Sequence, residues 1–152
     1  MREILFRGKA INRENCYHRT EYKNGEWVYG LVTKLYDEKF ENLPAEMTDI
    51  NGISNIEIDY KTINQYTGLT DDNGNKIFEG DIIRVKSLDW DYEYITKVYY
   101  SSHTLCVNLY NQDYDYTSIG FANDVWDEEN SVLEVVGNIY DNPELLKDGV
   151  EI

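Results

Sequence analysis

The sequence predicts a mainly β protein, and three of its features support this. Tyr, Trp and Phe number 14, 3 and 4 among the 152 residues, and aromatic side chains are enriched in strands. Short segments in which apolar and polar residues alternate recur along the chain, which is the pattern of half-buried strands. Pairs of asparagine and glycine separate several of them, as expected at tight turns. The expected strands are 2–7, 27–36, 56–60, 82–86, 92–100, 104–110, 114–121 and 132–139.

A central stretch, residues 65–86 with the sequence QYTGLTDDNGNKIFEGDIIRVK, combines turns and strands in a short span. Its Asn-Gly pair at 73–74 predicts a tight reversal. Gly80 precedes the strand at a corner, where we expect a backbone conformation that other residues adopt poorly. Ile83 and Val85 then share one face of that strand. Because a turn-rich lead-in, a Gly-Asp corner and a β-branched strand are typical of small SH3-like barrels, we expect such a barrel in the central and C-terminal part.

The organisation expected from these elements is a single domain of residues 1–152. Within it we distinguish an N-terminal β subdomain, residues 1–62, packed with the SH3-like barrel of residues 63–146. No internal repeat, low-complexity tract or linker rich in Gly, Ser or Pro interrupts the sequence. A short C-terminal helix is expected to follow, with Asn142 as its cap and Pro143 at its first position, where proline is tolerated.

Four local expectations concern the N-terminal part. The first strand should stop at Gly8. In the strand that follows, Trp27 is expected to be a core residue, and Gly30 to mark a bulge or a close approach of two backbones. The pattern then weakens across residues 37–55, for which we expect a loop with one helical turn near 44–47.

Composition narrows the range of partners and compartments. Lys and Arg number 14 against 29 Asp and Glu, a formal net charge of −15. Such a chain repels a phosphate backbone, so we expect no direct binding of nucleic acid. The sequence contains no apolar run long enough to span a membrane, and its start, MREILFRGKA, has no apolar core of a signal peptide. We therefore expect no membrane partner and a cytoplasmic location.

Residues that commonly carry chemistry are few and isolated. His18 and His103 are the only histidines, and neither lies in a catalytic or metal-binding motif. Cys16 and Cys106 are too few for a disulfide framework and lack the spacing of a metal site, so we expect reduced packing residues. We predict no catalytic residue, no metal and no cofactor. A small hydrolase that uses carboxylates stays open as an alternative, because acidic residues are abundant.

The acidic cluster of the central stretch resembles a calcium loop only superficially. Asp71, Asp72, Asn73 and Asn75 supply oxygen atoms, but an EF-hand needs glycine at its sixth position and glutamate at its twelfth. Counted from Asp71, glycine is fourth and the twelfth residue is isoleucine. We therefore expect a solvated turn.

One segment could form a contact surface. In an extended chain, alternation places Asp89, Asp91 and Glu93 on one face and Trp90 and Tyr92 on the other. Tyrosine and tryptophan are favoured anchors in protein interfaces, so these five residues are the candidate protein contact. A plain half-buried hairpin edge is the alternative interpretation.

Three blocks of the sequence together resemble a known family. They are REILFRG (2–8), QYTGLTDDNGNKIFEGDIIRV (65–85) and VVGNIYDNPELL (135–146). The chain resembles the YopX family of bacteriophage and prophage proteins, whose molecular function is uncharacterised. The resemblance covers nearly the whole chain and departs most between residues 9 and 62. It implies a largely β protein with SH3-like character and a phage or prophage origin, hence the host cytoplasm, and it transfers no catalytic residue.

The leading functional hypothesis is a non-enzymatic accessory protein that binds a host or phage protein. The absence of a catalytic motif and the aromatic and acidic segment at 89–93 motivate it. Two alternatives stay open beside it: the carboxylate-dependent hydrolase, and a virion or self-assembling structural protein. The sequence leaves homo-oligomers open as well.

Overall fold

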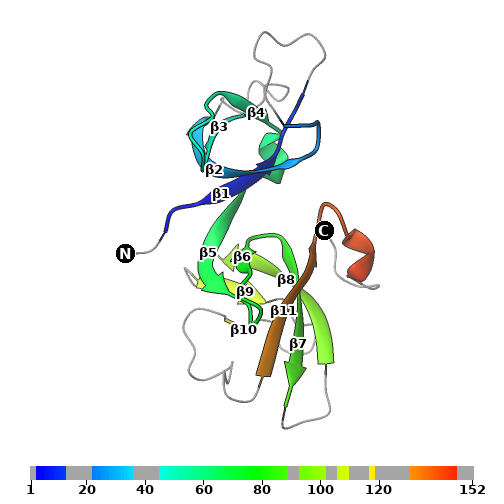
Figure 1. Ribbon diagram of the computed structural model, residues 1–152. Coiled ribbons are helices and arrows are strands. Elements are labelled where there is room, and N and C mark those ends of the chain that lie inside the picture. Colours follow the sequence, from blue (N-terminus) through cyan, green and yellow to red (C-terminus); the bar gives the residue numbers. More distant parts are fainter. Residues whose placement is uncertain are drawn as a thin grey trace. The chain divides into compact units, whose positions relative to one another are not determined.

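The computed structural model (Figure 1) describes residues 3–12, 22–35, 45–88, 93–101, 106–109, 117–118 and 131–146. The chain divides into two compact units, Met1–Tyr66 and Thr67–Ile152. Strands dominate both units, which confirms the mainly β class, and the helical residues among those described lie in short 3-10 turns. The strands form two sheets, in which every recorded pairing is antiparallel.

Unit 1 is built from four strands and the start of a fifth. The order of this sheet is β4-β3-β2-β1-β5-β6, so β1 lies between β2 and β5, and the last strand, β6 (Lys76–Phe78), belongs to unit 2. The bounds are β1 Phe6–Lys9, β2 Trp27–Lys34, β3 Ala45–Asp49, β4 Ile56–Ile58 and β5 Asn64–Thr70, with the 3-10 turn η2 at Tyr60–Thr62. β5 begins in unit 1, where Asn64 and Gln65 pair with β1, and continues into unit 2.

The sheet of unit 1 curls until its outermost strand meets β1 again. Ala10, just after β1, forms a bridge with Ile58 of β4. The Ile11 N–H donates to the Glu57 carbonyl at 2.8 Å, and the Asp59 N–H donates to the Lys9 carbonyl at 2.9 Å. This curl encloses one apolar core. Its buried members are Ala10, Val28, Ala45, Met47, Ile56 and Ile58.

Two glycines allow the backbones of unit 1 to approach closely. A Cβ atom at Gly30 would overlap the carbonyl oxygen of Thr48 and lie 2.7 Å from the Cα atom of Asp49. The close backbone approach expected at Gly30 is confirmed. The first strand does not stop at Gly8 as expected, because this residue lies inside β1. A Cβ atom there would overlap the side chain of Ile58, so glycine leaves room for the core.

The expected loop at 37–55 is wrong at 45–49, whereas 50–55 forms the expected loop, a turn followed by an irregular segment before β4. Residues 45–49 form β3 in place of the helical turn expected near 44–47, and Met47 is completely buried. In β3, buried residues alternate with half-buried polar ones, the buried ones being Ala45, Met47 and Asp49. The sequence did not predict this strand because Leu43-Pro44 and the many charges indicate a break. A tight turn then connects β3 to β4.

Unit 2 holds a five-stranded sheet of order β10-β9-β8-β7-β11. The bounds are β6 Lys76–Phe78, β7 Asp81–Ser87, β8 Glu93–Ser101, β9 Cys106–Leu109, β10 Thr117–Ser118 and β11 Ser131–Asn138. Ile83 and Val85 lie together in its core with Ile77, Val98 and Leu133, which confirms their shared face.

The finer description of unit 2 as an SH3-like barrel is not confirmed. Its described strands form an antiparallel sheet whose recorded order ends at β10 and at β11. The C-terminal helix is likewise not confirmed, because Pro143–Leu145 forms only one 3-10 turn. Pro143 lies at the start of this turn as expected, but the Asn142 side chain makes no capping hydrogen bond.

The corner before β7 has the expected conformation. Gly80 has a φ of +75°, a region that is costly for residues with a Cβ atom. Its N–H donates to the Val98 carbonyl at 2.9 Å, and its carbonyl accepts from the Ile139 N–H at 2.9 Å. The glycine therefore connects the corner before β7 to Val98 of β8 and to Ile139, the residue after β11.

Replacing Gly30 with alanine should destabilise the protein by about 3 kcal/mol or more, because the new methyl group would meet backbone atoms that cannot rotate away. Gly25→Ala is the matched control. Gly25 has a φ of +81° and no atom within 4 Å of its Cβ position, so its cost is conformational only, about 1 to 2 kcal/mol. Urea unfolding of both variants gives the comparison, and equal losses would contradict the steric explanation.

Candidate functional site

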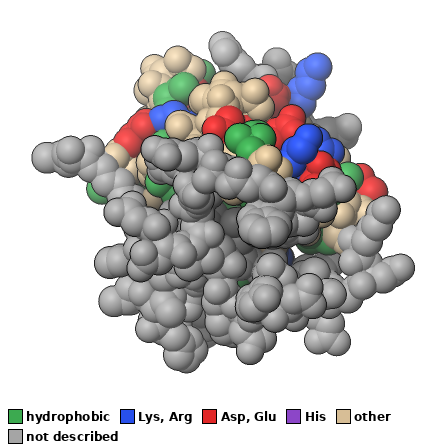
Figure 2. Space-filling model, turned by 90° about the horizontal axis from the view of Figure 1, so that it is seen from below, with side chains coloured by type: hydrophobic (Ala, Val, Ile, Leu, Met, Phe, Trp, Pro, Cys, Tyr) green, Lys and Arg blue, Asp and Glu red, His purple; other side chains and the backbone are tan. Residues whose placement is uncertain are grey.

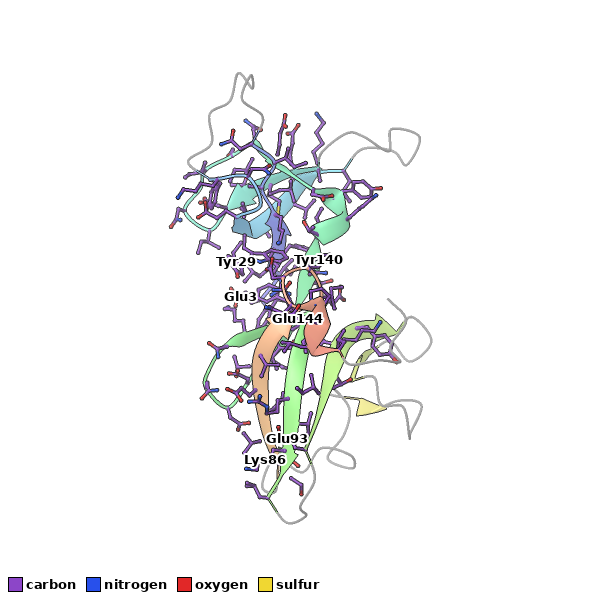
Figure 3. The ribbon with its side chains drawn as sticks, turned by 90° about the vertical axis from the view of Figure 1, so that its right-hand side faces the viewer. Glu3, Tyr29, Lys86, Glu93, Tyr140 and Glu144 are labelled. Atoms are coloured by element: carbon purple, nitrogen blue, oxygen red, sulfur yellow. The ribbon has the colours of Figure 1, made fainter. Side chains whose placement is uncertain are left out.

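The predicted contact segment 89–93 is described only at its last residue. Asp89, Trp90, Asp91 and Tyr92 lie outside the described residues. Glu93 begins β8 and is exposed. It is paired across the strands with Lys86 of β7, and Figure 3 shows both residues at the same end of this pair of strands.

Glu93 already has an ionic partner within the chain. Its Oε1 lies 3.1 Å from Nε of Arg84, at the distance of an ion pair but without the geometry of a hydrogen bond. Nη1 of Arg84 donates to Oε2 of Glu134 on β11 at 2.9 Å. Exposed ion pairs of this kind contribute only about 0 to 1 kcal/mol. A basic partner would nevertheless have to compete with Arg84 for this carboxylate.

The outward face of β7, β8 and β11 therefore carries both signs of charge. Strand alternation and pairing place Arg84, Lys86, Glu93 and Glu134 on this face. In the described part of the surface in Figure 2, basic side chains likewise lie among acidic ones. The two basic and two acidic residues named on this face contrast with the net charge of −15 of the whole chain.

A second surface lies on the outward side of β2, and we call it the β2 outer face. Alternation buries Val28 and Gly30 and exposes their neighbours. The exposed fractions are 38% for Tyr29 and 51% for Leu31, and Ile50, in the turn after β3, reaches 71%. The Ile50 N–H donates to the Tyr29 carbonyl at 2.9 Å, so these residues are neighbours across the strands.

Trp27 lies on this same side of β2, which corrects its assignment to the core. It is only partly buried. The Cζ atom of Arg7 lies 4.7 Å from the centre of its ring and Nζ of Lys9 lies 5.2 Å from it, both within cation–π range. Because the next residue, Val28, points into the core, strand alternation turns Trp27 outward. The β2 outer face comprises Lys9, Trp27, Tyr29, Leu31 and Ile50, and the buried Arg7 packs against its tryptophan.

The acidic turn of the central stretch is not solvated at its first residue. Asp71 is only 5% exposed. Its Oδ1 accepts the N–H groups of Asn73 at 3.0 Å and Asn75 at 2.7 Å. Its Oδ2 accepts the Asn75 side-chain amide and the Val135 N–H, both at 3.0 Å. Four donors match the roughly four lone-pair sites of a carboxylate, so Asp71 acts as a structural acceptor.

The same turn occurs once more, in unit 1, as Asp49-Ile50-Asn51-Gly52-Ile53. Oδ1 of Asp49 accepts the N–H groups of Asn51 at 2.9 Å and Ile53 at 2.7 Å. The Gly52 N–H donates to the Asp49 carbonyl at 3.1 Å, as the Gly74 N–H does to the Asp71 carbonyl at 2.9 Å. The hydroxyl of Tyr22 supplies a further donor to Asp49 at 2.7 Å. The shared sequence pattern Asp-x-Asn-Gly is the local signal of this turn.

Hydrogen bonding to the ionised form changes the acidity of both aspartates. Burial raises the pKa of Asp71, but hydrogen bonds from Asn75, Val135 and Asn73 outweigh it, so the pKa lies below the usual 3.8. Burial also raises the pKa of Asp49, and hydrogen bonds from Tyr22, Ile53 and Asn51 lower it further than burial raises it. Both groups are thus held as carboxylates in the folded chain.

A family model described as YopX protein matches residues 6–147. The chain belongs to the YopX family. A YopX relative, "SPbeta prophage-derived uncharacterized protein YopX" of Bacillus subtilis (strain 168), is 30% identical over 76 residues, which are 49% of this chain and 52% of that protein. The match thus spans about half the length of this curated relative.

Two solved structures are similar to this YopX-family chain. The crystal structure of protein EF1440 from Enterococcus faecalis has a TM-score of 0.50 and 24% identity, with 95% of this chain and 99% of the other covered. The X-ray structure of protein yopX from Bacillus subtilis has a TM-score of 0.49 and 17% identity, with coverage of 97% and 100%. The likeness to EF1440 concerns the fold alone.

The other residues of this YopX-family chain that were considered for chemistry include His18, His103 and Cys16, which lie outside the described residues. Cys106 is described only as the first residue of β9. Where the structure describes side chains, no group of three or more His, Cys, Asp or Glu is placed to hold a metal ion. In the same parts of the chain, no helix has the length and apolar character needed to cross a membrane.

Acid should destabilise the protein through Asp49 and Asp71. Because their pKa values are lower in the folded than in the unfolded chain, the unfolded chain binds protons first as the pH falls. The stabilisation is complete above the unfolded value near 3.8 and is lost as the pH falls through the folded values. Urea unfolding at several pH values between about 5 and 3 should therefore show a falling free energy of unfolding.

The variant Asp71→Asn separates this cause from general charge repulsion. It should cost about 1 to 3 kcal/mol at neutral pH, because the NH2 group that replaces one carboxylate oxygen cannot accept from the two donors at that oxygen, and it should flatten the loss of stability in acid. Glu144→Gln removes an exposed charge near the 3-10 turn and serves as the control. Equal acid sensitivity of Asp71→Asn and the unmodified protein would show that this carboxylate does not contribute.

Proposed function

We propose that the chain is a non-enzymatic accessory protein of a phage or prophage that acts by binding another protein in the host cytoplasm. The prophage setting rests on the name of its Bacillus subtilis relative, which describes that protein as derived from the SPbeta prophage. The binding role rests on one observation, the exposed apolar side chains of the β2 outer face.

This face has the composition of a protein interface. Tyr29, Leu31 and Ile50 are large apolar residues exposed at neighbouring positions, whereas single exposed apolar residues elsewhere on a surface need no explanation. Trp27 lies beside them with Arg7 against its ring. Tryptophan and tyrosine are among the residues enriched at the energetic centres of interfaces.

The β2 outer face also supports the role better than Glu93 does. Burying apolar side chains contributes free energy roughly in proportion to the area removed from water. The carboxylate of Glu93, by contrast, is engaged by Arg84, and its exchange of one ionic partner for another would contribute little. The contact role of residues 89–92 stays a prediction.

A variant that replaces Tyr29, Leu31 and Ile50 with serine should lose the partner while it keeps its fold. Exposed substitutions of this kind usually change stability by no more than about 0.5 kcal/mol each. Protein recovered from host lysate by the unmodified chain should be absent with the variant. The matched control replaces Leu88 and Ile95, exposed apolar residues of unit 2, with serine and should retain the partner.

Two outcomes would count against this assignment. A partner lost only when Glu93 is changed to glutamine, with association that slows as salt rises, would move the contact to the end of β7 and β8. Recovery of no protein above background at low salt by the unmodified chain would oppose the binding role itself.

A further inference from the structure

β11 lies at one end of the sheet of unit 2. Its recorded pairing is to β7 on one side, and it ends the strand order of this sheet. A strand at the end of a sheet presents a row of backbone N–H and C=O groups that can pair with another chain. Figure 1 shows β11 beside β7 along most of its length.

The second edge of β11 is occupied by the Asp71–Asp72 turn. A carboxylate oxygen of Asp72 accepts the Leu133 N–H, and the Asp72 N–H donates to the Leu133 carbonyl at 3.0 Å. Oδ2 of Asp71 accepts the Val135 N–H at 3.0 Å. Since the N–H and C=O of one strand residue point to the same side, these three groups belong to the edge that faces away from β7.

The turn imitates a neighbouring strand without being one. Two carboxylate oxygens take the place of strand carbonyls, and the Asp72 N–H takes the place of a strand N–H. The chain then reverses at Gly74, with a φ of +82°, so the turn offers no strand for a further pairing. This arrangement satisfies the edge groups locally, which is a recognised way to keep a sheet edge from associating.

We infer that the Asp71–Asp72 turn is an edge cap, and that β11 without this cap pairs antiparallel with the β11 of a second copy of the chain. β11 has the sequence SVLEVVGN, rich in valine, which favours strands. Identical strands can pair antiparallel about a two-fold axis. Repulsion between the two Glu134 side chains is reduced, because Arg84 already pairs with each of them.

Asp72→Pro removes both contacts of Asp72 with Leu133 and leaves Asp71 in place. Asp72 is the second residue of the turn closed by the Gly74 N–H and the Asp71 carbonyl, a position at which proline is favoured. The equivalent residue of the turn in unit 1 is Ile50, so the turn also forms around a side chain that accepts no hydrogen bond. Asp72→Ala is the second variant, which loses only the carboxylate contact, and Asp72→Asn is the control that keeps an acceptor oxygen.

Amide hydrogen exchange and sedimentation over a concentration series test the inference on the whole chain. At low concentration, the Leu133 amide of Asp72→Pro should exchange about tenfold faster or more, the effect of losing a charge-assisted hydrogen bond. At higher concentration this variant should dimerise and regain protection at Leu133 and Val135. Asp72→Ala should dimerise more weakly, and Asp72→Asn should match the unmodified chain in both measurements.

Three results would overturn the inference. A folded Asp72→Pro with a fast Leu133 amide that stays monomeric at every concentration would show that the open edge does not associate. A dimer in which the Leu133 and Val135 amides remain fast would place the contact elsewhere. If Asp72→Pro does not fold, an Asp72→Ala protein that is monomeric with an unchanged Leu133 amide would show that the carboxylate does not cap the edge.

Discussion

The carboxylate of Asp71 ties two parts of unit 2 together. It closes its own turn through the backbone of Asn73 and Asn75, and it holds β11 through the Val135 N–H. Leu133, two residues before Val135 on β11, is buried in the core with Ile83. Because an unpaired buried N–H costs about 1 to 3 kcal/mol, the position of the turn and the position of β11 depend on one another.

In unit 1, an aspartate closes the same kind of turn at the end of β3. Asp49 organises its turn with the same donors at the second and fourth residues beyond it, and a tyrosine hydroxyl replaces the strand N–H. The two turns differ in the residue after the aspartate, which is Ile50 in one and Asp72 in the other. That difference assigns them separate roles: Ile50 enlarges the apolar surface of the β2 outer face, whereas Asp72 satisfies the edge of β11.

The sequence predicted the strands whose side chains alternate cleanly and the glycines at corners and close approaches, such as Gly30 and Gly80. It did not predict β3, because Met47 and its neighbours are separated by polar residues whose burial depends on partners distant in sequence. The sequence-based prediction placed Trp27 in the core because its ring is large and apolar. The alternation of β2 turns it to the outer side, because its neighbour Val28 points into the core. Of the candidate contact, the structure describes Glu93 alone, and its ion pair with Arg84 depends on a strand register that no local pattern specifies.

The bridge between the end of β1 and β4 has a consequence for how unit 1 forms. The Lys9 N–H donates to the hydroxyl of Thr62, 53 residues further along the chain, and β1 also pairs with the start of β5. Contacts of such high sequence separation require a large loop to close before they stabilise anything, which slows folding. During synthesis, β1 can therefore pair first with β2 alone, and its contacts with β4, η2 and β5 form only after those later residues have left the ribosome.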